Sequence, residues 1–214
     1  MKIAVVTEIS TVERNKDIMK ALEAQEGNYE IINFGMKDKE DVPELNYNET
    51  AFLGALLLNT KRVDFVVGGC STGQGFMNSV LQYPGISCGH IMTPLDGWLF
   101  TQINGGNCIS LTLNLGYGWA SDENLYTIFD RLLCVESAAG YPAHRKEPQR
   151  IGREQFEGIS RATHVSFAEV LRRLPGEFVG KVLAIPGLYE ILAPETLEDK
   201  DVADILVGLQ KKTD

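Results

Sequence analysis

The sequence predicts an α/β protein in which five parallel strands carry helices on both faces and a mostly helical C-terminal extension follows. Short apolar runs alternate with helix-like segments through the first 140 residues. The runs are continuously apolar, as expected when both faces of a sheet are covered. From Tyr141 onward, prolines interrupt this pattern. We therefore expect a core of residues 1–140 and an extension of residues 141–214 that packs on the core or on a partner subunit.

The first half of the expected core alternates three strands with two helices. Ser10, with Glu13 three residues later, resembles a capping box that opens a helix ending near Ala24. A second, apolar-rich helix is expected over residues 48–59. The strands expected in this half are residues 2–7, 29–34 and 63–67.

The second half of the core continues the same alternation. Thr93-Pro94 marks a helix start, because proline fits the first helical turn. Ser121 is expected to cap a helix over residues 123–133. The other expected elements are a helix over 76–81 and strands over 86–92 and 108–113. Five strands that alternate with helices predict a three-layer, Rossmann-like parallel sheet.

The extension is expected to consist of short helical pieces. Ser166 and Glu169 resemble the cap of a helix that ends near Leu174, and residues 199–212 resemble a terminal amphipathic helix. The prolines that separate the pieces are Pro142, Pro148, Pro175 and Pro186.

Composition excludes several classes of function. The net charge of −9 over 214 residues argues against nucleic acid or an anionic membrane as the main partner, since both require a basic surface. No apolar run reaches the roughly 18 residues that span a bilayer. The N-terminus begins as a strand rather than a signal peptide, so we expect a cytoplasmic protein. The four cysteines are widely spaced and suit neither a metal site nor a disulfide framework.

A glycine-rich loop after the third expected strand is the most informative local feature. Residues 66–75 read Val-Val-Gly-Gly-Cys-Ser-Thr-Gly-Gln-Gly, with Cys70 and Thr72 delivered into the turn before a helix. Unpaired backbone N–H groups at such a turn can bind a phosphate or an oxyanion. The same position favours the thiolate form of a cysteine. The alternative is a structural turn that holds a buried cysteine.

Sheet topology predicts an acidic partner for this loop. In parallel sheets, ligands bind beyond the carboxyl ends of the strands, where the strand order reverses. In the common 2-1-3 order that point lies between strands one and three, so Glu8 and Cys70 are expected at one crevice. Glu8 could transfer a proton there, or it could only cap the next helix.

Three ordered motifs carry a family resemblance. They are Gly69-Cys70-Ser71-Thr72-Gly73-Gln74-Gly75-Phe76-Met77, Pro84-Gly85-Ile86 and Asn104-Gly105-Gly106-Asn107. The set resembles the type B ribose-5-phosphate isomerase family, which includes the LacA and LacB galactose-6-phosphate isomerases, over roughly residues 1–150.

The resemblance implies an aldose–ketose isomerase that acts on a small phosphorylated sugar through an enediolate. Cys70 would be the proton-transfer base, and Glu8 would act on the hydroxyl protons of the sugar. Thr72 and the N–H groups of residues 71–75 would donate hydrogen bonds to the oxyanion. The resemblance also implies a homodimer, or a higher homo-oligomer, whose active sites combine residues of two subunits. It implies that no metal or organic cofactor is needed. The substrate-binding residues expected from the match are Ser71, Gly73, Gln74, Gly75, Asn104 and Asn107.

Cations for the phosphate are expected from outside the core motifs. No lysine or arginine lies between Arg62 and Arg131. Arg145 and Arg150 lie where the family carries an arginine pair, so we expect them to bind phosphate across the subunit interface, with Lys146 as an alternative. A solvated basic patch is the alternative. His90, on the fourth strand, is expected to support the site rather than to catalyse.

Departures from the family pattern fall on its ring-opening groups. Ile9 and Ile103 replace two histidines, Ser87 replaces an arginine, and Ser71 replaces a loop glycine. An open-chain substrate, or a different sugar, would tolerate these losses. Two other hypotheses stay open: a non-catalytic sugar-phosphate sensor, and a nucleotide-binding module.

Overall fold

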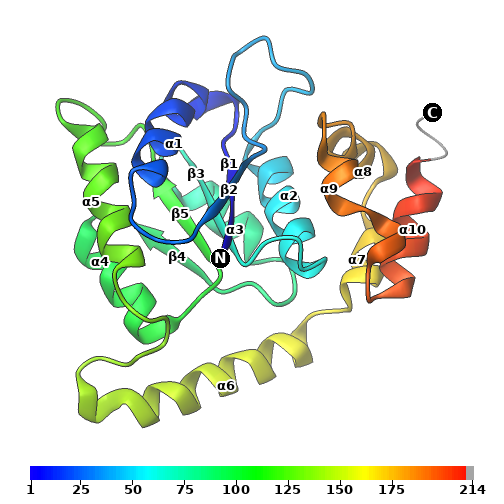
Figure 1. Cartoon of the computed structure of the whole chain (residues 1–214). Helices are drawn as coiled ribbons and strands as arrows, with labels where there is room; N and C mark the ends of the chain where they lie inside the picture. Colours follow the sequence, from blue (N-terminus) through cyan, green and yellow to red (C-terminus); the bar gives the residue numbers. More distant parts are fainter. Residues whose placement is uncertain (211–214) are drawn as a thin grey trace.

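A single parallel sheet forms the centre of the molecule (Figure 1). The computed structural model describes residues 1–210, and its five strands lie in the order β2-β1-β3-β5-β4. The expected 2-1-3 arrangement is thereby confirmed, and the strand order reverses between β1 and β3. The strands are β1 (Lys2–Val6), β2 (Glu30–Asn33), β3 (Phe65–Cys70), β4 (Cys88–Ile91) and β5 (Cys108–Thr112).

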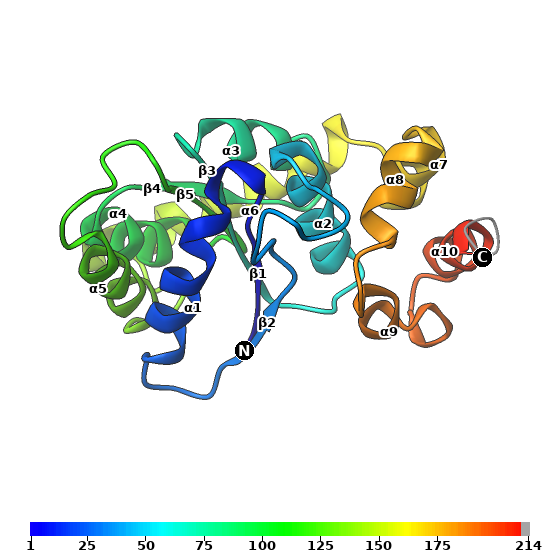
Figure 2. The same ribbon diagram turned by 90° about the horizontal axis from the view of Figure 1, so that it is seen from above.

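Helices cover both faces of the sheet, as predicted (Figure 2). One face carries α1 (Asn15–Glu23), α4 (Pro94–Leu99) and α5 (Ser121–Leu133). The other face carries α2 (Tyr47–Asn59) and α3 (Gln74–Val80). Side chains along β1 alternate between the two layers, with Ile3 and Val5 in one apolar cluster and Ala4 and Val6 in the other. Three short segments connect the layers: η1 (Ile9–Arg14), η2 (Phe100–Asn104) and η3 (Ala143–Arg145).

The C-terminal helices pack beside α2 and share its apolar cluster. Phe52 of α2 is fully buried, and its ring centroid lies 5.5 Å from that of Phe178 and 6.5 Å from that of Phe167. Arg62 adds a polar link, since its Nε donates to the carbonyl of Leu192 at 2.9 Å. The elements here are α7 (Phe167–Arg173), α8 (Gly176–Leu183), α9 (Leu188–Leu192), η4 (Pro194–Thr196) and α10 (Lys200–Gln210).

A long helix, α6 (Lys146–Thr163), connects the core to these helices and runs along the outside of the molecule (Figure 1). The expectation of only short helical pieces is wrong here. Pro148 lies in the first turn of α6, where a missing N–H removes no intrahelical hydrogen bond. None of the residues of α6 is buried. Neither α6 nor any other helix among residues 1–210 is long and apolar enough to cross a membrane.

Several predicted boundaries differ from the structure. The capping box at Ser10 and Glu13 is wrong: Glu8 caps η1 by accepting from the Ser10 N–H at 2.9 Å, and Glu13 pairs with Lys39. Ser121 does not cap α5 but is its first residue, and its hydroxyl accepts from the Gly118 N–H. The predicted helix end at Lys212 lies outside the described residues.

Strand β3 also runs three residues further than predicted, to Cys70. The two glycines before Cys70 stay in the strand because their missing side chains admit close neighbours. A Cβ on Gly68 would lie 2.1 Å from the Phe76 ring, and one on Gly69 would lie 2.4 Å from the Leu111 carbonyl oxygen. The glycine pair therefore allows the strand to pack tightly up to the residue that ends it.

We predict that Phe52→Ala lowers the free energy of unfolding by about 3–5 kcal/mol, because it leaves a cavity between α2 and the C-terminal helices. Urea unfolding measures the change. Trp119→Ala is the control, since the Trp119 side chain is fully exposed. A loss below about 1 kcal/mol in Phe52→Ala would show that this contact does not stabilise the fold.

Candidate active site

The loop of residues 70–73, between β3 and α3, is held from the side of β4 and β5. Gly73 has φ +75°, and a Cβ there would lie 2.5 Å from His90 Nε2. His90 Nε2 lies 3.0 Å from the Thr72 carbonyl oxygen and 2.9 Å from Thr112 Oγ1. The Ser110 hydroxyl donates to the Gly73 carbonyl. The carbonyls of the loop are thereby fixed, and His90 has the supporting position expected for it.

The loop is also tied to the segment that leaves β5. The Leu113 N–H donates to the Cys70 carbonyl at 3.1 Å, and the Asn114 N–H donates to the Ser71 carbonyl at 3.0 Å. The Asn114 side-chain amide donates to Ser71 Oγ and to the Ser10 carbonyl, each at 2.9 Å. Three chain segments that follow β1, β3 and β5 therefore meet at one point.

A row of polar side chains joins Glu8 to the loop. Ser10 Oγ donates to Glu8 Oε1 and lies 3.0 Å from Ser71 Oγ. Glu8 is buried, Ser71 is half-buried and Ser10 is exposed. We call this cluster of side chains, at the edge where β1, β3 and β5 end, the crevice; its members are Glu8, Ser10, Cys70, Ser71 and Asn114. The acid after β1 and the loop after β3 are thus brought together, although Glu8 contacts Ser10 rather than the loop and serves as a helix cap.

The Cys70 side chain lies on the α2–α3 side of the crevice and is 6% exposed. A Cβ on Gly75 would lie 3.5 Å from Cys70 Sγ and 3.4 Å from the Tyr47 ring. The thiol and the Tyr47 ring therefore flank the same face of Gly75. Tyr47, the first residue of α2, is 41% exposed.

The N-terminus of α3 presents backbone donors beside the thiol. Gly73 is the N-cap, and its own N–H donates to the Cys70 carbonyl at 3.2 Å. The Gln74 N–H makes a long contact of 3.4 Å with Thr72 Oγ1. The next N–H groups of the first turn, beginning at Gly75, lack intrahelical partners by helix geometry. Thr72 and Gln74 are exposed and so can contact a ligand.

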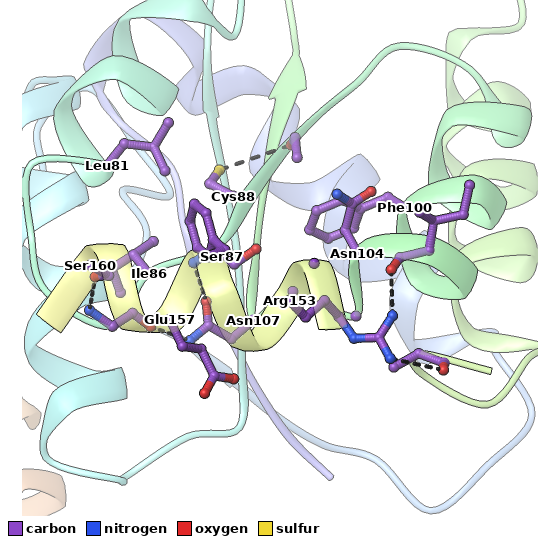
Figure 3. A pocket seen from close by; sticks show the side chains of 18 of the residues that line it. Leu81, Ile86, Ser87, Cys88, Phe100, Asn104, Asn107, Arg153, Glu157 and Ser160 are labelled. Carbon is purple, nitrogen blue, oxygen red and sulfur yellow. Dashed lines mark hydrogen bonds between the residues drawn. The ribbon is translucent and has the colours of Figure 1, made fainter. Parts of the chain in front are cut away.

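Asn104 and Asn107 line a hollow that we call the groove (Figure 3). It lies between α6 and the segments that precede β4 and β5, with a volume of about 1470 Å³. Asn104 is exposed there. The Asn107 side chain accepts from the Ser87 N–H at 2.9 Å and donates to the Gly85 carbonyl at 2.8 Å. Asn107 comes before β5 whereas Cys70 pairs with the last residue of β5, so the two lie at opposite ends of the sheet.

The three predicted phosphate-binding cations lie at the start of α6. Arg145 and Lys146 are exposed. Arg150 forms ion pairs with Glu147 and Glu154 on its own helix, and hydrogen bonds to these carboxylates raise its pKa further. Within one chain these cations face the groove side of the molecule rather than the crevice.

Arg153 is the arginine of α6 that contacts the core directly. Its Nη1 donates to the Ile103 carbonyl at 2.7 Å (Figure 3). Ile103 stands where the family pattern has a histidine. Because this bond uses only backbone on the core side, it positions α6 whatever side chain residue 103 carries.

No sequence motif marks Ser10, Asn114 or Tyr47 as neighbours of the Cys70 loop. Ser10 was assigned to a helix cap, and Asn114 follows a strand whose exit path depends on backbone pairing with Ser71. Tyr47 could have been found from the sequence. It directly follows Asn46, which forms a capping box with Glu49 and so marks the start of α2. Across residues 1–210, no group of three or more His, Cys, Asp or Glu side chains is placed to hold a metal ion.

Comparison with known families bears directly on this arrangement. A family model described as Ribose/Galactose Isomerase matches residues 3–146. The chain belongs to this family. The match covers β1 to β5, the crevice and the first residue of α6. A comparison with curated proteins finds no match.

Two solved structures resemble this isomerase-family chain over nearly its whole length. A 4-deoxy-L-threo-5-hexosulose-uronate ketol-isomerase, solved with a tartrate, is 33% identical with a TM-score of 0.94, covering 99% of this chain and 100% of that one. The ribose-5-phosphate isomerase LacAB_rpiB from Vibrio parahaemolyticus is also 33% identical, with a TM-score of 0.92, covering 98% and 99%. Both therefore share the C-terminal helices.

A shorter relative has the same core fold. The type B ribose 5-phosphate isomerase of Trypanosoma cruzi is 16% identical with a TM-score of 0.65. The alignment covers 98% of that chain but only 76% of this one. Part of this isomerase-family chain thus has no counterpart there.

We predict that Gly73→Ala and Gly75→Ala have opposite effects on stability. Alanine at position 73 would have an unfavourable φ, and its Cβ would clash with the His90 ring. We expect the free energy of unfolding to fall by about 1–3 kcal/mol. At position 75 the new methyl group meets only ordinary contacts within a helix, so stability should stay the same or rise. Urea unfolding of both variants decides, and equal losses would contradict the fixed loop.

Proposed function

We propose that the chain is an aldose–ketose isomerase that acts on a small phosphorylated sugar through an enediolate, with Cys70 as the base. The observation that carries this proposal is the convergence of Cys70, a buried carboxylate and the backbone donors of α3 on one crevice. Proton transfer between adjacent carbons requires a base at the carbon and donors for the developing oxyanion. The crevice offers both within one subunit.

In the proposed reaction, the Cys70 thiolate removes the proton from C2 of an aldose and returns it to C1. The negative charge then develops on the carbonyl oxygen, which the Thr72 hydroxyl and the N–H groups of Gly75 and neighbouring loop residues stabilise. Ser71, Gly73 and Gln74 shape the rest of the loop around the substrate. The burial of the thiol limits its contact with water during the transfer.

Glu8 is proposed to move the hydroxyl proton through a relay. The Asn114 amide donates to Ser71 Oγ, which leaves the Ser71 proton for Ser10 Oγ, and Ser10 donates to Glu8. The hydrogen bonds therefore run in one direction and end on the carboxylate. A substrate hydroxyl that gives its proton to Ser71 would displace the Ser71 proton to Ser10 and the Ser10 proton to Glu8. The reverse transfer along the same groups would return a proton to the former carbonyl oxygen, which restores the charge of Glu8.

A second candidate substrate is an open-chain sugar acid. Ile9 and Ile103 remove the histidines that the family pattern uses to open a sugar ring. The ketol-isomerase at 33% identity is described as acting on a hexosulose uronate, whose acidic group is a carboxylate instead of a phosphate. The same enediolate chemistry at Cys70 would serve this substrate. A non-catalytic sensor that only binds such sugars is the alternative, and turnover separates the two.

The complete site is proposed to form between two subunits of a homodimer or higher homo-oligomer. Asn104, supported by Asn107, and Arg145 with Lys146 and Arg150 lie away from the crevice of their own chain, so the partner's copies would bind the sugar hydroxyls and phosphate. Exposed apolar side chains on α6 support an interface there: Ile151 is 43% exposed, Phe156 45% and Ile159 61%.

We predict that Cys70→Ala lowers exchange of the substrate carbon-bound proton with solvent deuterium at least about 100-fold. Proton NMR in heavy water measures the exchange with ribose 5-phosphate, galactose 6-phosphate and 4-deoxy-L-threo-5-hexosulose uronate. Cys134→Ala is the control, because Cys134 is an exposed cysteine outside the crevice. Exchange as fast in Cys70→Ala as in wild type would reject the base assignment, and no exchange by wild type would favour the sensor.

We predict that two inactive variants restore activity when their subunits mix. Cys70→Ala removes the base and Arg145→Gln removes a proposed partner cation, so a mixed dimer keeps one intact site. After joint refolding at equal amounts, roughly a quarter of the wild-type sites should be active. Light scattering after size exclusion confirms that dimers have formed. Dimers without regained activity would show that each site uses one chain only.

A further inference from the structure

Arg14 has no role in the reaction proposed above, yet the fold brings it to the same edge of the sheet. It is the last residue of η1, which begins one residue after Glu8. The segment that follows β5 returns to this point and covers it. Arg14 is the first arginine of a chain that has no lysine or arginine between Arg62 and Arg131. Folding therefore places a cation beside a crevice whose own loop, residues 70–73, carries none.

The Arg14 side chain is held in one orientation by two contacts. Its guanidinium carbon lies 4.1 Å from the centroid of the Tyr117 ring, and its Nε donates to the Leu113 carbonyl at 3.3 Å. The Tyr117 hydroxyl donates to Asp17 at 2.7 Å, which fixes the ring beneath the guanidinium. Burial, with this hydrogen bond, raises the pKa of Tyr117 well above its usual range, so the ring stays neutral.

The two terminal nitrogens of Arg14 are available to a ligand. Among residues 1–210, neither Nη1 nor Nη2 forms a hydrogen bond or an ion pair. Arg150 and Arg153 differ, because carboxylates or carbonyls already occupy their terminal nitrogens. A half-buried guanidinium that is fixed at Nε and free at both Nη atoms presents two parallel donors, the geometry that binds a carboxylate or a phosphate.

A hollow of about 550 Å³ opens in front of Arg14. Lys16 of α1 and Lys37, from the chain that follows β2, also line it, so three cations surround the hollow. Two of its carboxylates are engaged, Glu13 by Lys39 and Asp17 by the Tyr117 hydroxyl, whereas Asp122 remains at its rim. The volume is within the range of small-molecule sites, and its charge is suited to one anionic group rather than to a polyanion.

Arg14 lies one residue away from the backbone of the catalytic loop. Leu113, whose carbonyl accepts from Arg14, donates its own N–H to the Cys70 carbonyl at 3.1 Å. Arg14 and the loop that carries Cys70 are therefore held at the same edge of the sheet through a single residue.

We propose that Arg14 binds the terminal anionic group, carboxylate or phosphate, of the sugar that reacts at Cys70. This rests on the proposed function, and it assigns recognition of the acid to the same subunit that supplies the base. Arg145 and Lys146 of a second subunit then add to the binding of an anionic group whose selection depends on Arg14. Arg14 thus determines which class of sugar binds, and it takes no part in proton transfer.

The test is the binding of three sugars that differ only at carbon six: galacturonate, galactose 6-phosphate and galactose. Isothermal titration measures each affinity for wild type, Arg14→Gln, Arg14→Lys and Arg145→Gln. The control is Arg131→Gln, in which an exposed arginine near the end of α5 loses the same charge. Wild type and the control should bind at least one acid at least tenfold more tightly than galactose. Arg14→Gln should remove this preference and change galactose affinity less than twofold, and Arg14→Lys should keep part of it.

The outcomes separate this proposal from the isomerase assignment. Equal binding of the acids and galactose by wild type, or an unchanged preference in Arg14→Gln, would overturn the role of Arg14. A preference lost only in Arg145→Gln would assign the acid to the partner subunit instead. Deuterium exchange run on the same samples reports the isomerase independently, since binding requires no turnover. The relative affinities for galacturonate and galactose 6-phosphate show whether the site at Arg14 prefers a carboxylate or a phosphate.

Discussion

The backbone hydrogen bonds between the loop after β3 and the segment after β5 are the constraint on which the crevice depends. The carbonyls of Cys70 and Ser71 accept N–H groups from residues 113–115. Without this pairing, Asn114 would not reach Ser10 and Ser71, and Leu113 would not present its carbonyl to Arg14. Side chains from three loops are therefore ordered by a short stretch of main-chain pairing that continues the parallel ladder beyond the sheet.

Charge placement follows from the same constraint. The proposed acidic sugar needs a cation, but a cation placed against the buried thiol loop would lose its hydration, which is unfavourable. Arg14 meets this requirement through the Tyr117 ring, which removes water from one face of the guanidinium and leaves the terminal nitrogens open. The cations on α6 are exposed instead, so their contribution depends on a partner surface that removes water from them.

The sequence predicted the sheet well because buried parallel strands are apolar runs, and the 2-1-3 rule brought Glu8 and Cys70 to one crevice without any contact being known. It predicted α6 poorly, since Pro148 suggests a break unless the helix start is known. The polar relay was also missed. Whether Ser10 caps a helix or contacts Ser71 depends on the path of residues 113–115, and no local pattern encodes that path. Local signals thus gave the layers, and tertiary pairing determined the site.

The replacement of the ring-opening histidines is built into the packing. Ile9 stands at one of these positions, donates its N–H to the Leu45 carbonyl at 2.9 Å and packs against the apolar cluster around α2. A histidine there would lose this apolar contact or bury an imidazole without a defined partner. Glu8, without a neighbouring histidine, accepts hydrogen bonds from the N–H and the hydroxyl of Ser10 and so caps η1. A site arranged in this way is suited to a sugar whose carbonyl is already free, and open-chain sugar acids are sugars of this kind. Arg14, proposed to bind the acid, lies at the same end of the sheet.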